Sequence, residues 1–206
     1  AADTVQGNYI GFDPSADVPD FGYGNSGFGI DVQNAGSTIG GTGANEANVI
    51  SFNDSVGIDV SGSGASIVGN RIGTELTSQL VMGIGNVVIN LEGASDVTIS
   101  QDVIANNSND GIHIEQSSAV QILGNKIGTD DSGTEQGVGN QDDGIEIVNV
   151  AASAGSTPQV LIDGNLIASN AGDGIRLTSA NGVKITGNVI GYNTTDSDTG
   201  FVFGNN

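Results

Sequence analysis

The feature that most constrains the fold of this chain is a five-residue phrase, GNxIG, which occurs four times. The copies begin at Gly7, Gly69, Gly124 and Gly187. Weaker copies that keep the isoleucine occur at Asn48-Val49-Ile50, Asp102-Val103-Ile104 and Asn165-Leu166-Ile167. A motif that recurs at intervals of about 20–50 residues is typical of a solenoid, in which each repeat is one structural unit.

Three ladders of apolar residues follow when the copies are aligned on this isoleucine. The first is Ile10, Ile50, Ile72, Ile104, Ile127, Ile167 and Ile190. The second lies five residues earlier and comprises Val5, Ile67, Ile99, Ile122, Ile162 and Ile185, with Asn45 in the place that precedes Ile50. The third follows each phrase as a GIxV-like segment and comprises Ile30, Ile58, Ile89, Ile112, Ile145 and Ile175, with Phe201 starting a seventh copy.

Each repeat therefore contains three short segments in which apolar and polar residues alternate, separated by turns rich in Gly, Asn, Ser and Asp. Such alternation indicates β-strands with one buried face. The chain is predicted to be all-β, a single parallel β-helix over residues 1–206 with about seven coils of three strands. Each strand pairs with its counterpart one coil away, at about 4.8 Å.

The connections that follow the first ladder alternate between long and short. This alternation makes the true repeat two coils, anchored at Ile10, Ile72, Ile127 and Ile190. The long loops are expected to emerge at one corner of the helix, on every second coil. The asparagine of each phrase recurs in every coil except one, which has Asp102, and is expected to hydrogen-bond turn backbone above and below it. The preceding glycine suits a bend that needs a positive φ.

The chain resembles exported bacterial and archaeal proteins with right-handed parallel β-helix repeats, written GNxIGTD…G…GN…GIxI, of the pectin-lyase-like fold. The resemblance covers essentially the whole chain. It implies a right-handed helix and an extracellular or cell-surface location. It does not identify an activity, because this scaffold carries lyases, hydrolases, adhesins and fibre proteins alike.

The composition narrows the range of partners. The net charge is −20, from 24 acidic and 4 basic residues, and such a field repels nucleic acid and anionic lipid headgroups. Three interpretations fit this acidity: an exported calcium-binding protein, a protein from a salty habitat, or colloidal solubility. There is no cysteine, and no apolar run approaches the length of a membrane span.

The two ends of the chain read as parts of one coil. Written in series, GFVFGNN and AADTVQGNYIGFD resemble the internal segment GIHIEQSSAVQILGNKIGTD. We expect subunits to stack head to tail by strand pairing, a contact that does not close and therefore builds filaments. The alternatives are a piece of a longer solenoid and a capped monomer. The expected interface residues are Val5, Tyr9, Ile10, Phe201, Val202 and Phe203.

A catalytic site is the alternative from a different class. The outward column of the GIxV segments is Asp31, Asp59, Asn90, His113, Glu146 and Arg176. Asp110 in NSNDGI, and Asp142 and Asp143 in NQDDGI, resemble the acid and base aspartates of polygalacturonase-like hydrolases. The next coil reads NAGDGI where that family has Gly-His-Gly, and no Arg-x-Lys follows. His113 is interpreted as a surface residue near Glu146, away from these aspartates, rather than as a ligand.

Calcium is a possible cofactor, because several loops are rich in oxygen ligands. The residues expected to bind it are Asp130, Asp131, Glu135, Asp196 and Asp198. The sequence thus favours a non-enzymatic structural β-solenoid that is a subunit of a fibre or cell-surface layer. The alternative is a polysaccharide-active enzyme, or a carbohydrate-binding or adhesion module, on the same fold.

Overall fold

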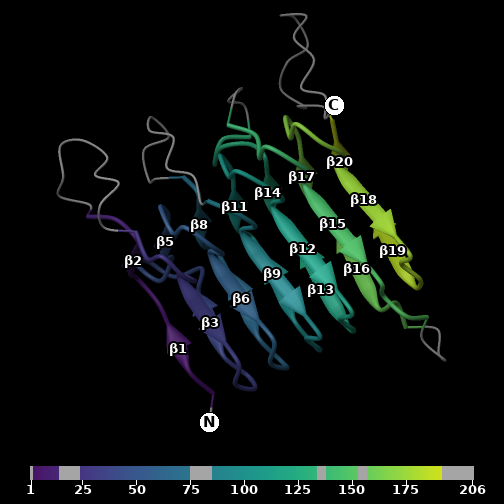
Figure 1. The fold of residues 1–206 in the computed structure, drawn as a ribbon, viewed down its shortest axis with the longest axis horizontal. Coiled ribbons are helices and arrows are strands. Elements are labelled where there is room, and N and C mark those ends of the chain that lie inside the picture. Colours follow the sequence, from purple (N-terminus) through teal and green to yellow (C-terminus); the bar gives the residue numbers. More distant parts are fainter. Residues whose placement is uncertain (1, 14–23, 75–84, 134–137, 153–156, 192–206) are drawn as a thin grey trace, which may run out of the picture.

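The computed structural model describes residues 2–13, 24–74, 85–133, 138–152 and 157–191, and these form a rod of stacked β-coils (Figure 1). One sheet, here called sheet A, contains seven strands: β1 (Thr4–Val5), β4 (Thr38–Gly40), β7 (Ser66–Val68), β10 (Thr98–Ser100), β13 (Val120–Leu123), β16 (Val160–Asp163) and β19 (Val183–Thr186). All neighbours in sheet A are parallel.

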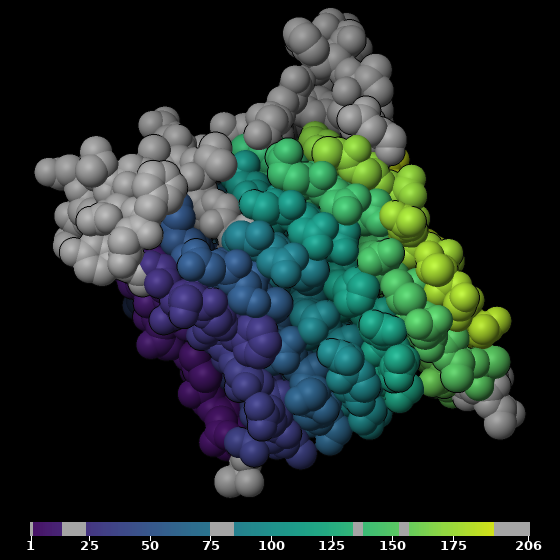
Figure 2. Space-filling view, in the orientation of Figure 1, coloured from purple at the N-terminus to yellow at the C-terminus, as the bar shows by residue number. Residues whose placement is uncertain are grey.

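Sheets B and C complete each coil. Sheet B contains β2 (Tyr9–Ile10), β5 (Val49–Ile50), β8 (Arg71–Ile72), β11 (Val103–Ile104), β14 (Lys126–Ile127), β17 (Leu166–Ile167) and β20 (Val189–Ile190). Sheet C contains β3 (Ile30–Val32), β6 (Ile58–Val60), β9 (Ile89–Glu92), β12 (Ile112–Glu115), β15 (Ile145–Val148) and β18 (Ile175–Thr178). The chain visits A, B and C in turn, so successive coils form the parallel bands that Figure 2 shows. The predicted three-strand coil is confirmed.

The register of the sheets confirms the first and third ladders. Ile104 pairs with Ile72 on one side and Ile127 on the other, and Ile112 lies between Ile89 and Ile145. Phe201–Phe203, the predicted start of a seventh sheet C strand, lies outside the described residues.

The second ladder was predicted wrongly in one coil. Ile39, not Asn45, occupies the place between Val5 and Ile67 in sheet A. Ile39 lies eleven residues before Ile50, whereas the other members lie five residues before their isoleucine. The extra residues form a turn in which Asn45 has a φ of 66°. The ladder is therefore complete in all seven coils.

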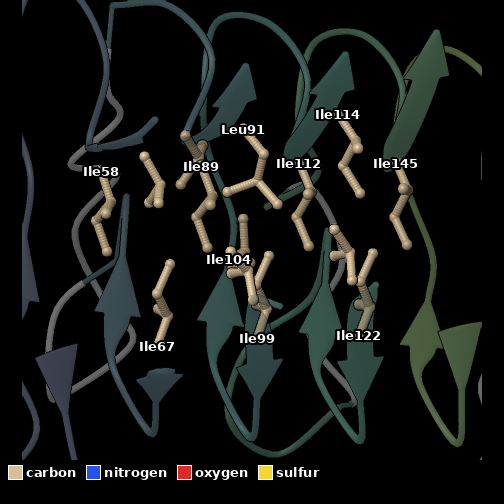
Figure 3. Packing of buried hydrophobic residues seen from close by; sticks show 14 of the residues in the cluster. Ile58, Ile67, Ile89, Leu91, Ile99, Ile104, Ile112, Ile114, Ile122 and Ile145 are labelled. Atoms are coloured by element: carbon tan, nitrogen blue, oxygen red, sulfur yellow. The ribbon is translucent and has the colours of Figure 1, made fainter. Parts of the chain in front are cut away.

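The core consists of these stacked columns (Figure 3). Side chains such as Ile67, Ile99 and Ile122 from sheet A meet Ile104 from sheet B and Ile112 from sheet C, and all five are fully buried. Burying one such side chain contributes about 1.5–3 kcal/mol. The periodic spacing of the sequence is thus the direct source of the continuous core.

The alternation of loop lengths is confirmed by the bounds of the strands. The connections from sheet B to sheet C run from Ile10 to Ile30, 50 to 58, 72 to 89, 104 to 112, 127 to 145 and 167 to 175. They all leave the same corner, because they all join the same two sheets. Parts of the long connections lie outside the described residues.

The asparagine of GNxIG forms a continuous ladder along the rod. Nδ2 of Asn125 donates to Oδ1 of Asn165 in the next coil, at 2.9 Å, and to the carbonyl of Ile99 in the preceding coil, at 3.0 Å. The backbone N–H of Asn125 donates to the same Oδ1. Asn48, Asn70 and Asn165 repeat this pattern. The expected structural role of the phrase is confirmed.

Candidate functional site

The outer face of sheet C carries the polar column that the sequence predicted. The register places Asp31 beside Asp59, then Asn90, His113, Glu146 and Arg176. Each of these lies between two inward-facing core positions of its strand, which fixes its outward direction. The column therefore stands on a rigid surface.

Three predicted carboxylates converge at the entrance of two neighbouring strands. Asp110 precedes β12, and Asp142 and Asp143 precede β15. Their nearest oxygen atoms all lie within 4.8 Å of one another. Asp110 and Asp143 are buried, whereas Asp142 is exposed. The three aspartates singled out in the sequence therefore lie together in the structure. Their motifs alone do not show what the cluster does.

His113 belongs to this cluster, and its predicted separation from the aspartates is wrong. Its Nδ1 lies 3.0 Å from Oε2 of Glu146, as expected, but also 3.8 Å from Oδ2 of Asp110. The strand begins only at Ile112, so the outward-inward alternation does not extend back through Gly111 to Asp110. The turn brings residues three apart in sequence to the same side.

Arg176 closes the cluster on the side of β18. Its guanidinium lies 3.5 Å from Oδ2 of Asp143 and 3.8 Å from Oε1 of Glu146. Four carboxylates, one imidazole and one guanidinium therefore share this surface, which we call the lateral cluster: Asp110, His113, Asp142, Asp143, Glu146 and Arg176. Its net charge is negative even when His113 is protonated.

The lateral cluster shifts the protonation of two of its members. The side-chain interaction with Asp110 raises the pKa of His113, with further contributions from the charges of Glu146 and Asp110 that outweigh burial. Burial, followed by the charges of Asp110 and Asp142, raises the pKa of Asp143 against the effects of its bond from Asp173 and of Arg176. Neighbouring carboxylates thus raise both pKa values, although burial is the largest cause for Asp143.

Two of the three aspartates also have a structural task. Oδ1 of Asp110 accepts the backbone N–H of Asp143 at 3.0 Å, and Oδ1 of Asp143 accepts that of Asp173 at 2.6 Å. These bonds tie three successive coils together before the DGI segments. One oxygen of each carboxylate is thus committed to the scaffold, and the other faces the cluster.

The predicted calcium residues lie elsewhere and are only partly described. Oδ2 of Asp131 accepts from Arg71 at 2.7 Å, and Lys126 contacts its Oδ1 at 3.4 Å. The bond with Arg71 lowers the pKa of Asp131 despite burial, assisted by the charges of Arg71 and Lys126. Ser132 donates to Asp130 at 2.6 Å. Glu135, Asp196 and Asp198 lie outside the described residues, and calcium binding there stays a prediction.

The end coils are the second candidate site. The described residues expose five large apolar side chains, each by 42–47%, and all five lie in the first or last coils: Tyr9, Phe28, Leu177, Ile185 and Ile190. Ile162 and Ile167, which occupy the same columns one coil earlier than Ile185 and Ile190, are fully buried. The core columns therefore run out to both described ends of the rod.

The predicted interface residues of the first coil lie on this surface. Val5 and Ile10 are partly buried, and the ring of Tyr9 packs edge-on against Phe12 with centroids 5.4 Å apart. Phe201, Val202 and Phe203, the predicted interface residues of the other end, lie outside the described residues.

The asparagine ladder ends differently at the two ends. Within the described ranges, Oδ1 of Asn8 accepts no hydrogen bond, whereas Oδ1 of every following member accepts from the coil before it. The backbone N–H of Asn188 donates to no described residue, whereas that of each preceding member donates to the next coil. One end therefore offers an acceptor and the other a donor.

A second ladder of asparagine side chains, not predicted from the sequence, also runs along the rod. Nδ2 of Asn107 donates to Asn140 at 2.7 Å, and Nδ2 of Asn140 donates to Asn170 at 2.8 Å. Asn25 and Asn53 form the same pair in the first two coils. The signal was present, because each of these asparagines lies five residues before a sheet C isoleucine.

The comparison with known families agrees with this architecture. Residues 73–206, which are 134 of the 206 residues, match the family described as right handed beta helix region. The chain belongs to this family. No curated protein and no solved structure matches the chain significantly. The molecule is thus an all-β, right-handed parallel β-helix of about seven coils. No helix within the described ranges is long and apolar enough to cross a membrane.

Proposed function

We propose that this right-handed β-helix is a non-enzymatic structural solenoid that assembles head to tail with further copies of itself, as a subunit of a fibre or cell-surface layer. The observation that carries the proposal is the complementarity of its two described ends. Exposed Ile185 and Ile190 continue the columns that begin with Val5 and Ile10 of the first coil.

The hydrogen-bonding groups at the two ends favour the same head-to-tail direction of stacking. The backbone N–H of Asn188 would donate to Oδ1 of Asn8 of the next copy, as each internal member does to its successor. Strand edges β19 and β20 would pair with β1 and β2, with each column in register. Because the joined surfaces are different, the contact repeats without closing.

The remaining parts of the proposal rest on sequence features. The extracellular or cell-surface location rests on the resemblance of the GNxIG repeats to those of exported proteins. The exclusion of nucleic acid as a partner and of membrane insertion rests on the net charge of −20 and on the lack of a long apolar run.

Sedimentation velocity over a concentration series tests the assembly. Wild-type protein should form species larger than the monomer, and the double variant Ile185→Lys, Ile190→Lys should remain monomeric because it buries two charges at the joint. Leu161→Lys is the matched control, since Leu161 faces outward on β16, an internal strand of sheet A. Equal assembly of the double variant and the wild type would refute end pairing, and so would a wild type that stays monomeric throughout.

A second candidate function is hydrolysis of a polysaccharide at the lateral cluster. It is favoured by one observation, the convergence of Asp110, Asp142 and Asp143. Asp142→Asn is the informative variant, because Asp142 is exposed and its side chain makes no hydrogen bond to the described scaffold. Turnover of a saccharide by the wild type that this variant abolishes would establish the enzyme. Binding without turnover would indicate a carbohydrate-binding module.

A further inference from the structure

The lateral cluster contains a donor set that shares only Asp110 with the second candidate function. His113, Glu146 and Asp110 each offer one donor atom, and all three atoms lie within 4.8 Å of one another. His113 and Glu146 stand side by side on β12 and β15, and Asp110 is held just before β12. The set mixes an imidazole with two carboxylates from two coils, so it is more than a group of acidic side chains.

Two of the three separations can be compared directly with those that a small divalent cation imposes. Metal–nitrogen and metal–oxygen bonds of about 2.0–2.2 Å place neighbouring donors about 3.0–3.6 Å apart at angles between 90° and 110°. Nδ1 of His113 lies 3.0 Å from Oε2 of Glu146 and 3.8 Å from Oδ2 of Asp110. The first separation falls in this range and the second is slightly longer, while the donor oxygens of Asp110 and Glu146 lie within 4.8 Å of each other.

The scaffold holds Asp110 in a fixed position beside the imidazole. Its side chain is only 6% exposed, and Oδ1 is fixed by the N–H of Asp143. The distance from Oδ2 to Nδ1 of His113 exceeds that of a normal hydrogen bond. A cation between this oxygen and the imidazole would replace the long contact with two short metal–ligand bonds.

The surroundings complete the arrangement. Arg176 faces Oε1 of Glu146 at 3.8 Å, which leaves Oε2 directed to His113. An outer partner of this kind orients a ligating carboxylate. Asp142 and Asp143 add negative charge next to the three donors. His113 and Glu146 are each about one fifth exposed, so a water molecule or an external ligand can reach the remaining positions.

We propose that Asp110, His113 and Glu146 bind one divalent transition-metal ion on the outer face of sheet C. An imidazole donor favours zinc, copper, iron or nickel over calcium and magnesium, which prefer oxygen ligands alone. The site is distinct from the predicted calcium loop at Asp130 and Asp131. It is also independent of end-to-end assembly, because it lies on the side of the rod.

Zinc titration by isothermal calorimetry, with the full chain in 0.15 M salt containing excess Ca²⁺, tests the site. The wild type should bind one Zn²⁺, and His113→Asn and Glu146→Gln should each weaken binding about tenfold or more. Glu92→Gln is the matched control, since Glu92 is an exposed outward residue of sheet C and should bind like the wild type.

An independent readout separates coordination from general attraction of cations to an acidic surface. Co²⁺ should give the visible absorption of an imidazole- and carboxylate-bound ion in the wild type and Glu92→Gln, but not in His113→Asn. Zinc binding that Ca²⁺ abolishes, or that survives both ligand variants unchanged, would overturn the proposal. Circular dichroism confirms that each variant is folded, and the two ligand variants provide separate tests.

Discussion

The backbone N–H of Asp102 donates to Oδ1 of Asn125 at 2.9 Å, as in every other step of the asparagine ladder, but Asp102 has no amide to make the second bond. Its Oδ1 accepts two bonds from Asn70, and its buried Oδ2 has no partner in the described part of the chain. In the other coils, the equivalent Nδ2 donates to two acceptors. A proton on Oδ2 would restore one donor at this place.

This relationship predicts that the contribution of Asp102 to the stability of the rod depends on pH. Burial raises the pKa of Asp102 from 3.8 to about 7, against the hydrogen bonds from Asn70. Below pH 3.8 both folded and unfolded chains keep the proton. Between pH 3.8 and 7 only the folded chain keeps it, so the contribution of Asp102 to stability falls as the pH rises and is lowest above 7.

Asp102→Asn should therefore stabilise the protein most above pH 7 and least near pH 3.5. Three pKa units correspond to about 4 kcal/mol, which is an upper limit for the gain. Thermal or urea unfolding of variant and wild type from pH 3.5 to 8 measures the difference. Asp96→Asn is the control, because it removes an exposed charge. A constant difference across this range would show that Asp102 is not a buried acid.

The two glycines of one GNxIG copy should respond differently to alanine. Both have positive φ, 63° for Gly124 and 79° for Gly128. A Cβ at Gly124 meets nothing within 4 Å, whereas a Cβ at Gly128 would lie 2.1 Å from the carbonyl oxygen of Ala168 in the next coil. Gly124→Ala should cost about 1–2 kcal/mol of unfolding free energy, from backbone strain alone.

Gly128→Ala should cost several times more, because backbone atoms of two coils would have to separate. Urea unfolding of the two variants, prepared side by side, measures the contrast. Equal costs would mean that the coils are not in close contact at this corner.

Removing one internal member should interrupt the asparagine ladder. Asn125→Ala loses an acceptor for Asp102 and donors to Ile99 and Asn165, all at a buried position. A buried unpaired polar group costs about 1–3 kcal/mol, so a total loss of a few kcal/mol is expected. Asn34→Ala, which removes an exposed bond to Asp3, should change the unfolding free energy little. Similar losses for both variants would argue against a structural role for the ladder.

A charge in the first ladder should be poorly tolerated. Ile127 is fully buried between Ile104 and Ile167, and Ile127→Asp would place an unpaired carboxylate there. The expected loss is about 4 kcal/mol or more, large enough to prevent folding. Gln121→Asp, on the exposed face of β13, is the control. An unchanged melting temperature for Ile127→Asp would contradict the column assignment.

The columns could be predicted from the sequence because stacking coils repeats the same environment along the rod. Ile127 and its counterparts lie at the same inward-facing position in each coil and are all apolar. Their regular spacing in the sequence therefore revealed the column. Ile39 was missed because the alignment assumed a constant step of five residues, and the turn of its coil is longer.

The arrangement of the candidate site was harder to predict from the sequence. The neighbouring coils placed Asp110 with Asp142 and Asp143, as expected because Asp110 and Asp143 each directly precede a Gly and Asp142 is adjacent to Asp143. The contact between Asp110 and His113 depends on the path of one turn, where neither the two-residue period nor the coil repeat applies. The unequal ends of the ladder became visible only once the hydrogen bonds from each coil to the next were known.

Electron microscopy of the purified wild-type chain, with and without a chelator, tests the central claim most directly. Head-to-tail assembly predicts filaments with an axial repeat of about 34 Å, which is seven coils at about 4.8 Å each. Filaments that need calcium would add that ion to the joint or to the loops. Discrete particles of monomer size at every concentration would contradict the proposed assembly.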